Sequence, residues 1–236
     1  MKTTYHSADS RGFADHGWLK AKHSFSFANY YDPNRIHFGV LRVLNDDIID
    51  PGKGFGMHPH NDMEIITIPL RGSLEHKDNM GNGSVITAGE VQVMSAGTGI
   101  MHSEFNPSPD KDINLFQIWI FPAEKGVDPR YDQKMFDQDS YKNSIVRLVD
   151  NEEGGGSLFI HQKATISLSK PEAGTTLDYE NHYPGNGVYV LLIEGKITLD
   201  KNTLSMRDAI GVWDTDSFSF TAEEDSFVLF VEVPMH

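Results

Sequence analysis

The chain of 236 residues contains no cysteine, which excludes disulfide bonds, iron–sulfur clusters, thiolate zinc sites and a cysteine nucleophile. The first residues, from Met1 to His6, contain no apolar segment of the kind that signal peptides carry. No apolar run approaches the ~18 residues of a membrane span. We therefore expect a cytoplasmic protein that has no membrane segment.

Positive charge is also scarce, because 20 lysines and arginines stand against 34 aspartates and glutamates. The net charge is −14 with histidine neutral. A surface of this sign repels phosphate backbones and anionic lipid, so direct binding to nucleic acid or to a membrane is not expected. Eleven histidines are many for this length, and 21 glycines with 11 prolines indicate many turns.

Helical periodicity is nearly absent, and only Asp132–Tyr141 could form a short helix. Short runs rich in valine, isoleucine, phenylalanine and threonine instead alternate with turn residues, which is typical of strands. The first set of expected strands is His37–Leu44, Glu64–Leu70, Gly83–Ile86, Glu90–Ser95 and Ile113–Phe121. The second set is Ile145–Val149, Leu158–Ile160, Ala164–Leu168, Val188–Glu194, Lys196–Leu199, Ala209–Trp213, Ser217–Thr221 and Ser226–Val233. This regular spacing predicts an all-β sandwich or barrel.

The two sets resemble each other, and the polar segment Pro122–Tyr141 between them is interpreted as a linker. A strand, a glycine turn and a further strand follow in order at residues 64–74 and again at residues 188–197. In the same way, Gly89–Ser95 matches Asp208–Asp214. This similarity favours an internal duplication of a β-barrel unit, and the alternative is one large irregular β domain.

A pair of histidines, His58 and His60, follows a glycine-rich segment that starts at Gly52. Residues i and i+2 of a strand point to the same face, about 7 Å apart along the chain, so both imidazoles can converge on one ion. Pro59 between them suits an edge or bulged position, because it lacks an N–H group. Glu64 has the same parity and would then face the same interior.

A second pair, His102 and Glu104, repeats the spacing after another glycine-rich turn, about 40 residues further along the chain. A lone His-x-His pair often has no metal role, but two such pairs favour a metal site. Neutral imidazoles with a carboxylate suit a divalent ion such as iron, copper, nickel, cobalt or zinc. Three histidines and one glutamate would leave two open positions on an octahedral ion, which is a catalytic arrangement.

Both segments resemble the motifs of the cupin superfamily. The first motif is matched by Gly52-x5-His58-x-His60-x3-Glu64-x7-Gly72. The second motif is similar to Gly89-x5-Ser95-x-Gly97-x4-His102-x3-Asn106, with Ser95 in place of the usual proline and two extra residues before the histidine. A closer resemblance, to the pirin family, is carried by His58-Pro59-His60, Ser95–Glu104, Arg11-Gly12, Phe25–Tyr30 and Phe38–Val43.

The pirin resemblance implies a bicupin fold, with two jelly-roll-like β-barrels in one chain. We expect a metal-binding domain over residues 1–125 and a cupin-like domain without metal ligands over residues 126–236. The implied metal ligands are His58, His60, His102 and Glu104. Glu64, which is a ligand in the usual cupins, would lie beside them without binding the ion. The remaining histidines in question, expected at the surface or in structural roles, are His37, His76, His161 and His182.

The resemblance also implies an activity, that of a quercetin 2,3-dioxygenase. Such an enzyme uses one divalent transition metal, with Fe(II) favoured here and Cu, Ni, Co, Mn or Zn left open. Its partners are a small aromatic substrate, a flavonol, and dioxygen, and the central ring opens with release of carbon monoxide. Either Glu104 or Glu64 would accept the proton of the 3-hydroxyl group. We expect a monomer or a weak oligomer.

Five aromatic side chains are candidates for the wall of an apolar substrate pocket: Phe25, Phe27, Tyr30, Phe38 and Phe55. Ordinary core packing is the alternative for about half of them. Two other functions also remain open. Eukaryotic pirins resemble redox-sensing transcription co-regulators that bind protein partners through an iron site, and a metal-holding scaffold with another substrate is the third reading.

Overall fold

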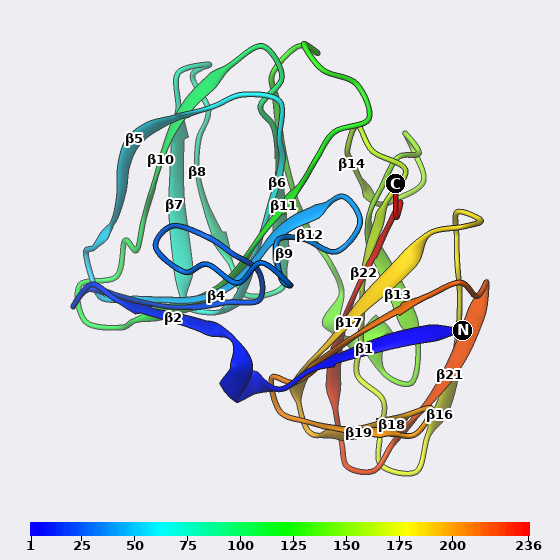
Figure 1. The fold of residues 1–236 in the computed structure, drawn as a ribbon. Helices are drawn as coiled ribbons and strands as arrows, with labels where there is room; N and C mark the ends of the chain where they lie inside the picture. Colours follow the sequence, from blue (N-terminus) through cyan, green and yellow to red (C-terminus); the bar gives the residue numbers. More distant parts are fainter.

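The computed structural model describes residues 1–236 and is built almost entirely of β-strands (Figure 1). The strands form two barrels, and each barrel consists of one seven-stranded sheet and one four-stranded sheet. The predicted all-β architecture of two barrels in one chain is confirmed. Two short 3-10 helices, η1 (Ala8–Ser10) and η2 (Gln138–Tyr141), complete the regular structure. Neither has the length and apolar character that crossing a membrane would require.

The N-terminal barrel combines a large and a small sheet. The large sheet has the order β12 (Arg130–Met135), β9 (Glu90–Ser95), β6 (Glu64–Arg71), β11 (Ile113–Ile120), β4 (Leu41–Ile49), β3 (Leu19–His23) and β2 (Gly12–Asp15). The small sheet has the order β5 (Gly54–His60), β10 (Ile100–Phe105), β7 (Ser73–Asp78) and β8 (Gly83–Thr87).

The C-terminal barrel repeats this arrangement. Its large sheet has the order β1 (Lys2–His6), β20 (Ala209–Trp213), β17 (Gly187–Glu194), β22 (Phe227–Val233), β15 (Thr165–Ser169), β13 (Ile145–Asp150) and β14 (Leu158–Phe159). Its small sheet has the order β16 (Thr176–Glu180), β21 (Ser217–Ala222), β18 (Lys196–Leu199) and β19 (Asn202–Ser205).

Two strands cross the boundary expected after residue 125. The first strand, β1, pairs with β20 in the C-terminal barrel, and Figure 1 shows this blue strand among the orange and red ones. The segment interpreted as a linker contains β12, which pairs with β9 of the N-terminal barrel. Only η2 within this segment is helical. Because β12 is a largely exposed edge strand, its sequence lacks the apolar alternation that identifies a half-buried strand. The boundary itself stays a prediction.

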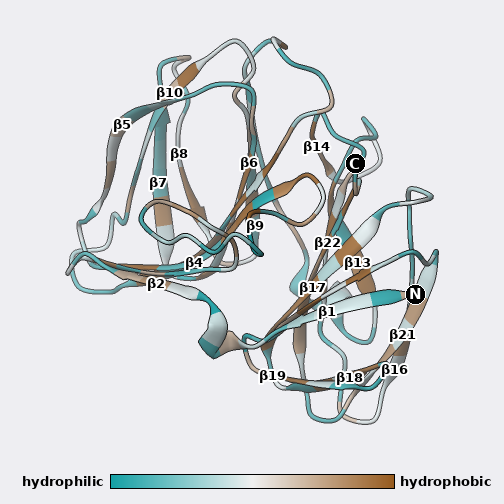
Figure 2. Cartoon of the chain, viewed as in Figure 1, coloured by the Kyte–Doolittle hydropathy of each residue, from teal (hydrophilic) through white to brown (hydrophobic).

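The two large sheets pack face to face and share a core of 27 buried side chains. In β11, Phe116, Ile118 and Ile120 belong to this shared core. Ile113 and Leu115 of the same strand point the other way, into the N-terminal barrel. Figure 2 shows the resulting hydrophobic bands along β17 and β22. Since both faces of these strands are buried, their sequences read as nearly continuous apolar runs.

The interiors of the two barrels differ. A separate cluster of 13 buried side chains fills the C-terminal barrel. It includes Tyr179 stacked on Phe218 at 5.2 Å and Phe220 tilted against Phe230 at 5.4 Å between ring centroids. The N-terminal barrel has an apolar cluster of only seven buried side chains at the end near Ile49. A second cluster, of four buried side chains, includes Ile65 and Met94. Buried polar side chains such as His76, His102 and Glu104 share this interior, so this barrel can hold a chemical site.

Glu64 does not face the histidines, contrary to the parity argument from the sequence. It lies on the face of β6 that carries Ile66, and Ser95 Oγ donates a hydrogen bond of 2.7 Å to its Oε2. Its Oε1 has no partner. The chain leaves the strand conformation between β5 and β6, so the parity of His60 is not carried into β6. Burial raises the pKa of the Glu64 carboxyl to about 7, although hydrogen bonds from Ser95 and the backbone oppose this shift.

The buried Glu64 carboxyl leads to a prediction about stability and pH. Its pKa is higher in the folded chain than the value of 4.5 expected after unfolding, so the folded state binds the proton more tightly. Stability from this group is therefore complete below pH 4.5 and falls as the pH rises toward about 7, by roughly 3 kcal/mol in total. We expect Glu64→Gln to match the wild type near pH 4.5 and to exceed it in free energy of unfolding at pH 8.

Urea denaturation of both proteins across this pH range measures the difference directly. Comparing the two chains at each pH cancels the contribution of all other titrating groups. A Glu64→Gln chain that is less stable than the wild type by the same amount at every pH would show that the ionised carboxylate is stabilised where it lies.

Candidate metal centre

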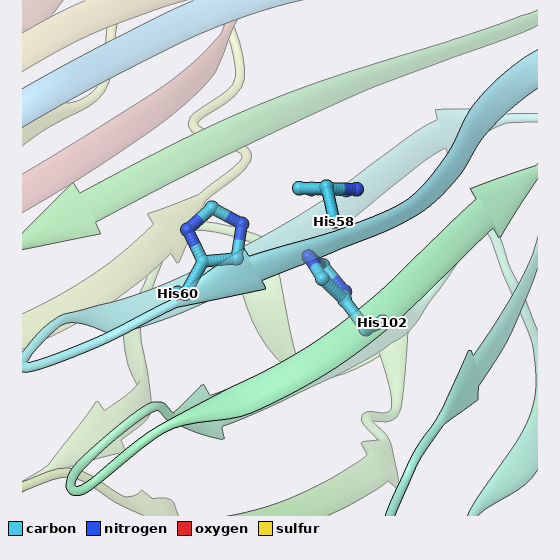
Figure 3. A group of neighbouring side chains, drawn as sticks. All are labelled: His58, His60 and His102. Atoms are coloured by element: carbon cyan, nitrogen blue, oxygen red, sulfur yellow. The ribbon is translucent and has the colours of Figure 1, made fainter.

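Three histidines converge at one end of the N-terminal barrel. His58 and His60 come from β5 and His102 from β10, and antiparallel pairing places His102 opposite His58. Figure 3 shows the three imidazole rings gathered over these two strands. Ring centroids lie 4.4 Å apart for His58 and His102 and 4.9 Å apart for His60 and His102. One donor nitrogen from each ring lies within 4.8 Å of the others, so the three can share one ion.

A glycine and a register shift bring the two strands together here. The pairing of β10 with β5 shifts between His102 and Glu104. At Gly54, a Cβ atom would lie 2.1 Å from the carbonyl oxygen of Glu104, so no larger residue fits. His102 and Glu104 remain on the same buried face of β10, whereas Ser103 between them is only half-buried. The i, i+2 spacing therefore works as expected within this strand.

The imidazoles of His60 and His102 are neutral at physiological pH. Burial and the neighbouring His58 lower the pKa of His60 to about 4. Burial, followed by the nearby His58, His60 and His76, lowers the pKa of His102 to about 2. In His58, Nδ1 lies 2.7 Å from the carbonyl oxygen of Gly56 and donates a hydrogen bond to it. The lone pair of this imidazole is then on Nε2. Neutral imidazoles with free lone pairs are the form that binds a divalent ion.

His102 carries the observation that tests whether a metal fits. Its Nε2 atom is buried and has no hydrogen-bond partner. Its Nδ1 lies 3.5 Å from Nδ1 of His76, whose Nε2 lies 3.3 Å from Oδ2 of Asp78. Because the carboxylate accepts from His76 Nε2, this chain of contacts leaves the proton of His102 on Nδ1 and a lone pair on Nε2. A metal ion is the natural partner for such a nitrogen, so the residues fit the group.

Glu104 lies beside the three histidines. Its Oε2 accepts a hydrogen bond of 2.9 Å from Gln117 Nε2. The hydroxyl of Thr67 lies 3.0 Å from Gln117 Oε1 and 3.4 Å from Glu104 Oε1, and its single proton serves one of them at a time. Donor atoms of His76, His102 and Glu104 also lie within 4.8 Å of one another. Burial raises the pKa of Glu104 to about 7, opposed by hydrogen bonds from Thr67, Gln92 and Gln117.

A cavity of about 210 Å³ opens next to these residues. It is lined by Phe27, Asn45, Asp47, Phe55, His58, His60, Glu104, Gln117 and Trp119. Two of the five aromatic residues expected in a substrate pocket, Phe27 and Phe55, are therefore present. Phe25 and Phe38 instead pack in the core shared by the two sheets. Tyr30 lines a separate hollow, where it stacks on His23 at 6.4 Å.

The sequence analysis missed the polar lining of the cavity, which comes from the middle of buried strands. Asn45 and Asp47 lie in β4, and Gln117 and Trp119 lie in β11. A polar residue inside an otherwise apolar strand was the available signal for each. His76, expected to be a surface or structural histidine, is fully buried and touches His102.

A further group of possible ligands lies in the C-terminal half, where donor atoms of Asp150, Glu152 and His182 are within 4.8 Å. The guanidinium of Arg147 lies among them, since Nη1 donates to Asp150 Oδ2 and is 3.2 Å from His182 Nε2. The positive charge of Arg147 thus already balances the carboxylate of Asp150. The expectation that the second domain holds no metal stays a prediction.

The chain matches two family models, pirin over residues 5–120 and the quercetinase C-terminal cupin domain over residues 148–233. A quercetin 2,3-dioxygenase of Escherichia coli K12 is 44% identical over 96% of both chains. A pirin-like protein of Caulobacter vibrioides is 42% identical over 95% of this chain and 96% of its own.

Solved structures are similar over the whole chain. The bacterial pirin YhhW of Escherichia coli, in complex with nickel(II), superposes with a TM-score of 0.93 and 41% identity, covering 99% of each chain. Such identity over nearly the full length, together with both family models, shows that this protein belongs to the pirin family.

Proposed function

We propose that this protein is a metal-dependent dioxygenase that opens the central ring of a flavonol such as quercetin and releases carbon monoxide. The observation that carries the proposal is the group of three converging imidazoles, held beside Glu104 at an aromatic-lined cavity. The names of the relatives, quercetin 2,3-dioxygenase, support the same reaction.

The proposed cofactor is one divalent transition metal held by His58, His60, His102 and Glu104. When bound, it would supply a Lewis acid that lowers the pKa of a coordinated hydroxyl group. The nickel(II) complex of the related YhhW supports a divalent ion. Fe(II) is proposed as the native ion, because imidazole and carboxylate ligands suit it.

The walls of the cavity would hold a flat aromatic substrate. Phe27 meets Trp119 edge-on at 5.4 Å between ring centroids, and Trp119 meets His60 edge-on at 4.9 Å. Phe55 lies 6.4 Å from the ring of His58. Aromatic side chains give a ring-shaped ligand a large contact area and exclude water from it.

Glu104 is the carboxyl group placed to receive the proton of the substrate 3-hydroxyl, because it lines the cavity and Glu64 does not. Gln117 fixes one carboxyl oxygen by donating to it, and Thr67 lies against the other. These two residues pair directly across β11 and β6, so the orientation of the carboxyl rests on the sheet itself. A general base held in this way typically contributes about 10²–10⁴-fold to a rate.

The stoichiometry of the products tests the proposed reaction. Both atoms of one dioxygen enter the ring-opened ester, and one ring carbon leaves with its oxygen as carbon monoxide. We expect one carbon monoxide per flavonol consumed, by protein purified without metal and then reconstituted with each candidate ion. Tight metal binding without turnover of any flavonol would overturn the proposal and favour the regulatory alternative.

Replacing a histidine ligand tests the metal centre. We expect His102→Ala to reduce bound metal from about one ion per chain to nearly none and to abolish turnover. The barrel should remain folded, because its stability comes from the shared apolar core. Metal analysis and far-ultraviolet circular dichroism check both points. An unfolded spectrum would mean that the metal is structural.

The two glutamates give a matched pair of variants. We expect Glu104→Gln to weaken metal binding and to slow flavonol oxidation by about 10²–10⁴-fold. Glu64→Gln, on the opposite face of the sheet, should keep both the metal and most of the activity. Metal content and rate are measured side by side. Loss of metal in Glu64→Gln with retention in Glu104→Gln would reverse the assignment.

A further inference from the structure

Asp47 is a buried carboxyl group in the cavity that the proposed chemistry does not use. It lies on β4, where alternate side chains face opposite sides of the sheet, and only 5% of its surface is exposed. Its neighbour Asp46 faces the other half of the chain, where Arg207 Nε lies 3.4 Å from its Oδ2. Asp47 instead lines the cavity together with His58 and His60.

The Asp47 carboxyl lacks the hydrogen-bond partners that Glu104 and Glu232 have. Its Oδ1 is buried without any hydrogen bond. Glu104 in the same cavity accepts from Gln117, and Glu232 in the other barrel accepts from the backbone N–H groups of His182 and Tyr183. A buried polar atom without a partner destabilises a protein, so one that lines a cavity points to a ligand that completes it.

Burial, with the nearby charges of Asp46 and Glu104, raises the pKa of Asp47 to about 8. The carboxyl group is therefore mostly protonated at neutral pH. In this form it can accept a hydrogen bond at one oxygen and donate one from the other. A hydroxyl group, which also donates and accepts, is the matching ligand group.

Another residue that lines this cavity, Trp119, also has a buried polar atom without a partner, its Nε1. The indole ring stands edge-on to Phe27 and to His60. Polar atoms without partners, set among aromatic rings, fit a flat aromatic ring that carries polar substituents.

Asp47 is separate from the candidate metal ligands. The groups of donor atoms that lie within 4.8 Å of one another join His58, His60, His76, His102 and Glu104, and none of them includes Asp47. Its carboxyl therefore addresses a part of the ligand other than the oxygen that faces the histidines.

We propose that Asp47 selects hydroxylated aromatic substrates, by forming a hydrogen bond with a ring hydroxyl other than the one presented to the histidines. The inference rests on the proposed flavonol oxidation and names the feature of the substrate that this site prefers. Flavonols that carry additional hydroxyl groups on their outer rings meet this requirement, and the unsubstituted 3-hydroxyflavone does not.

The test measures binding of quercetin and of 3-hydroxyflavone, without dioxygen, to the metal-loaded wild type, Asp47→Ala and Asp47→Asn. We expect Asp47→Ala to raise the dissociation constant of quercetin about tenfold (~1.4 kcal/mol) and that of 3-hydroxyflavone less than about twofold. Asp47→Asn keeps an acceptor oxygen and should recover part of the preference. The matched control is Asp46→Asn, which changes the adjacent carboxyl on the opposite face and should leave the ratio of the two constants unchanged.

The ratio of the two constants decides the inference. Equal weakening of both ligands by Asp47→Ala would assign Asp47 a purely structural role. Unchanged dissociation constants for both ligands would show that Asp47 makes no contact with them. Either result overturns the proposal. Absence of any preference in the wild type overturns it as well. Carbon monoxide release from 3-hydroxyflavone reports separately on the proposed function. If carbon monoxide is released but the wild type binds quercetin no more tightly than 3-hydroxyflavone, only the role of Asp47 is wrong. If the wild type prefers quercetin, Asp47→Ala loses this preference and no carbon monoxide is released, only the proposed reaction is wrong.

Discussion

The contact between the two seven-stranded sheets is the constraint on which the site depends. It buries one face of β4, β6, β9 and β11 of the N-terminal large sheet against the other half of the chain. Side chains alternate along a strand, so every polar residue of β6 and β11 that avoids this contact must point into the barrel. Thr67 and Gln117 do so, next to Ile66 and Ile118 in the shared core. A shift of one residue in register would turn the polar side chains toward the shared core and the apolar ones into the barrel. The apolar interface therefore determines which polar side chains face the site.

The convergence of His58, His60 and His102 could be predicted from the sequence because their geometry is local. The spacing of His58 with His60 and of His102 with Glu104 sets their direction within a single strand, and only one strand pairing was needed to bring the pairs together. The position of Glu64 could not be predicted in this way, because the alternation of side chains ends where the chain leaves the strand conformation between β5 and β6. In the same way, β12 has little apolar pattern of its own and becomes a strand only because β9 offers an edge.

The cavity was harder to predict than the ligands, because its lining is set by pairing between distant strands. Thr67 meets Gln117 only because β6 and β11 pair in one register, and that contact orients the carboxyl of Glu104. The aromatic residue type alone did not indicate which side chains line the cavity. Phe27 reached the cavity and Phe25 the shared core, although they are two residues apart, because the chain leaves the sheet after β3 and no strand alternation governs them.

The two barrels share one architecture but differ in the side chains that occupy their interiors. In the C-terminal barrel, Phe218, Phe220 and Phe230 fill the interior and stabilise it by burial. In the N-terminal barrel, part of this apolar filling is replaced by imidazoles and by carboxyl groups whose pKa values are raised by burial, which weakens that interior. The shared core offsets this cost, because it packs against the outer face of the N-terminal barrel and stabilises it. The contact with the second barrel is thus a physical condition for keeping so many polar groups buried in the first.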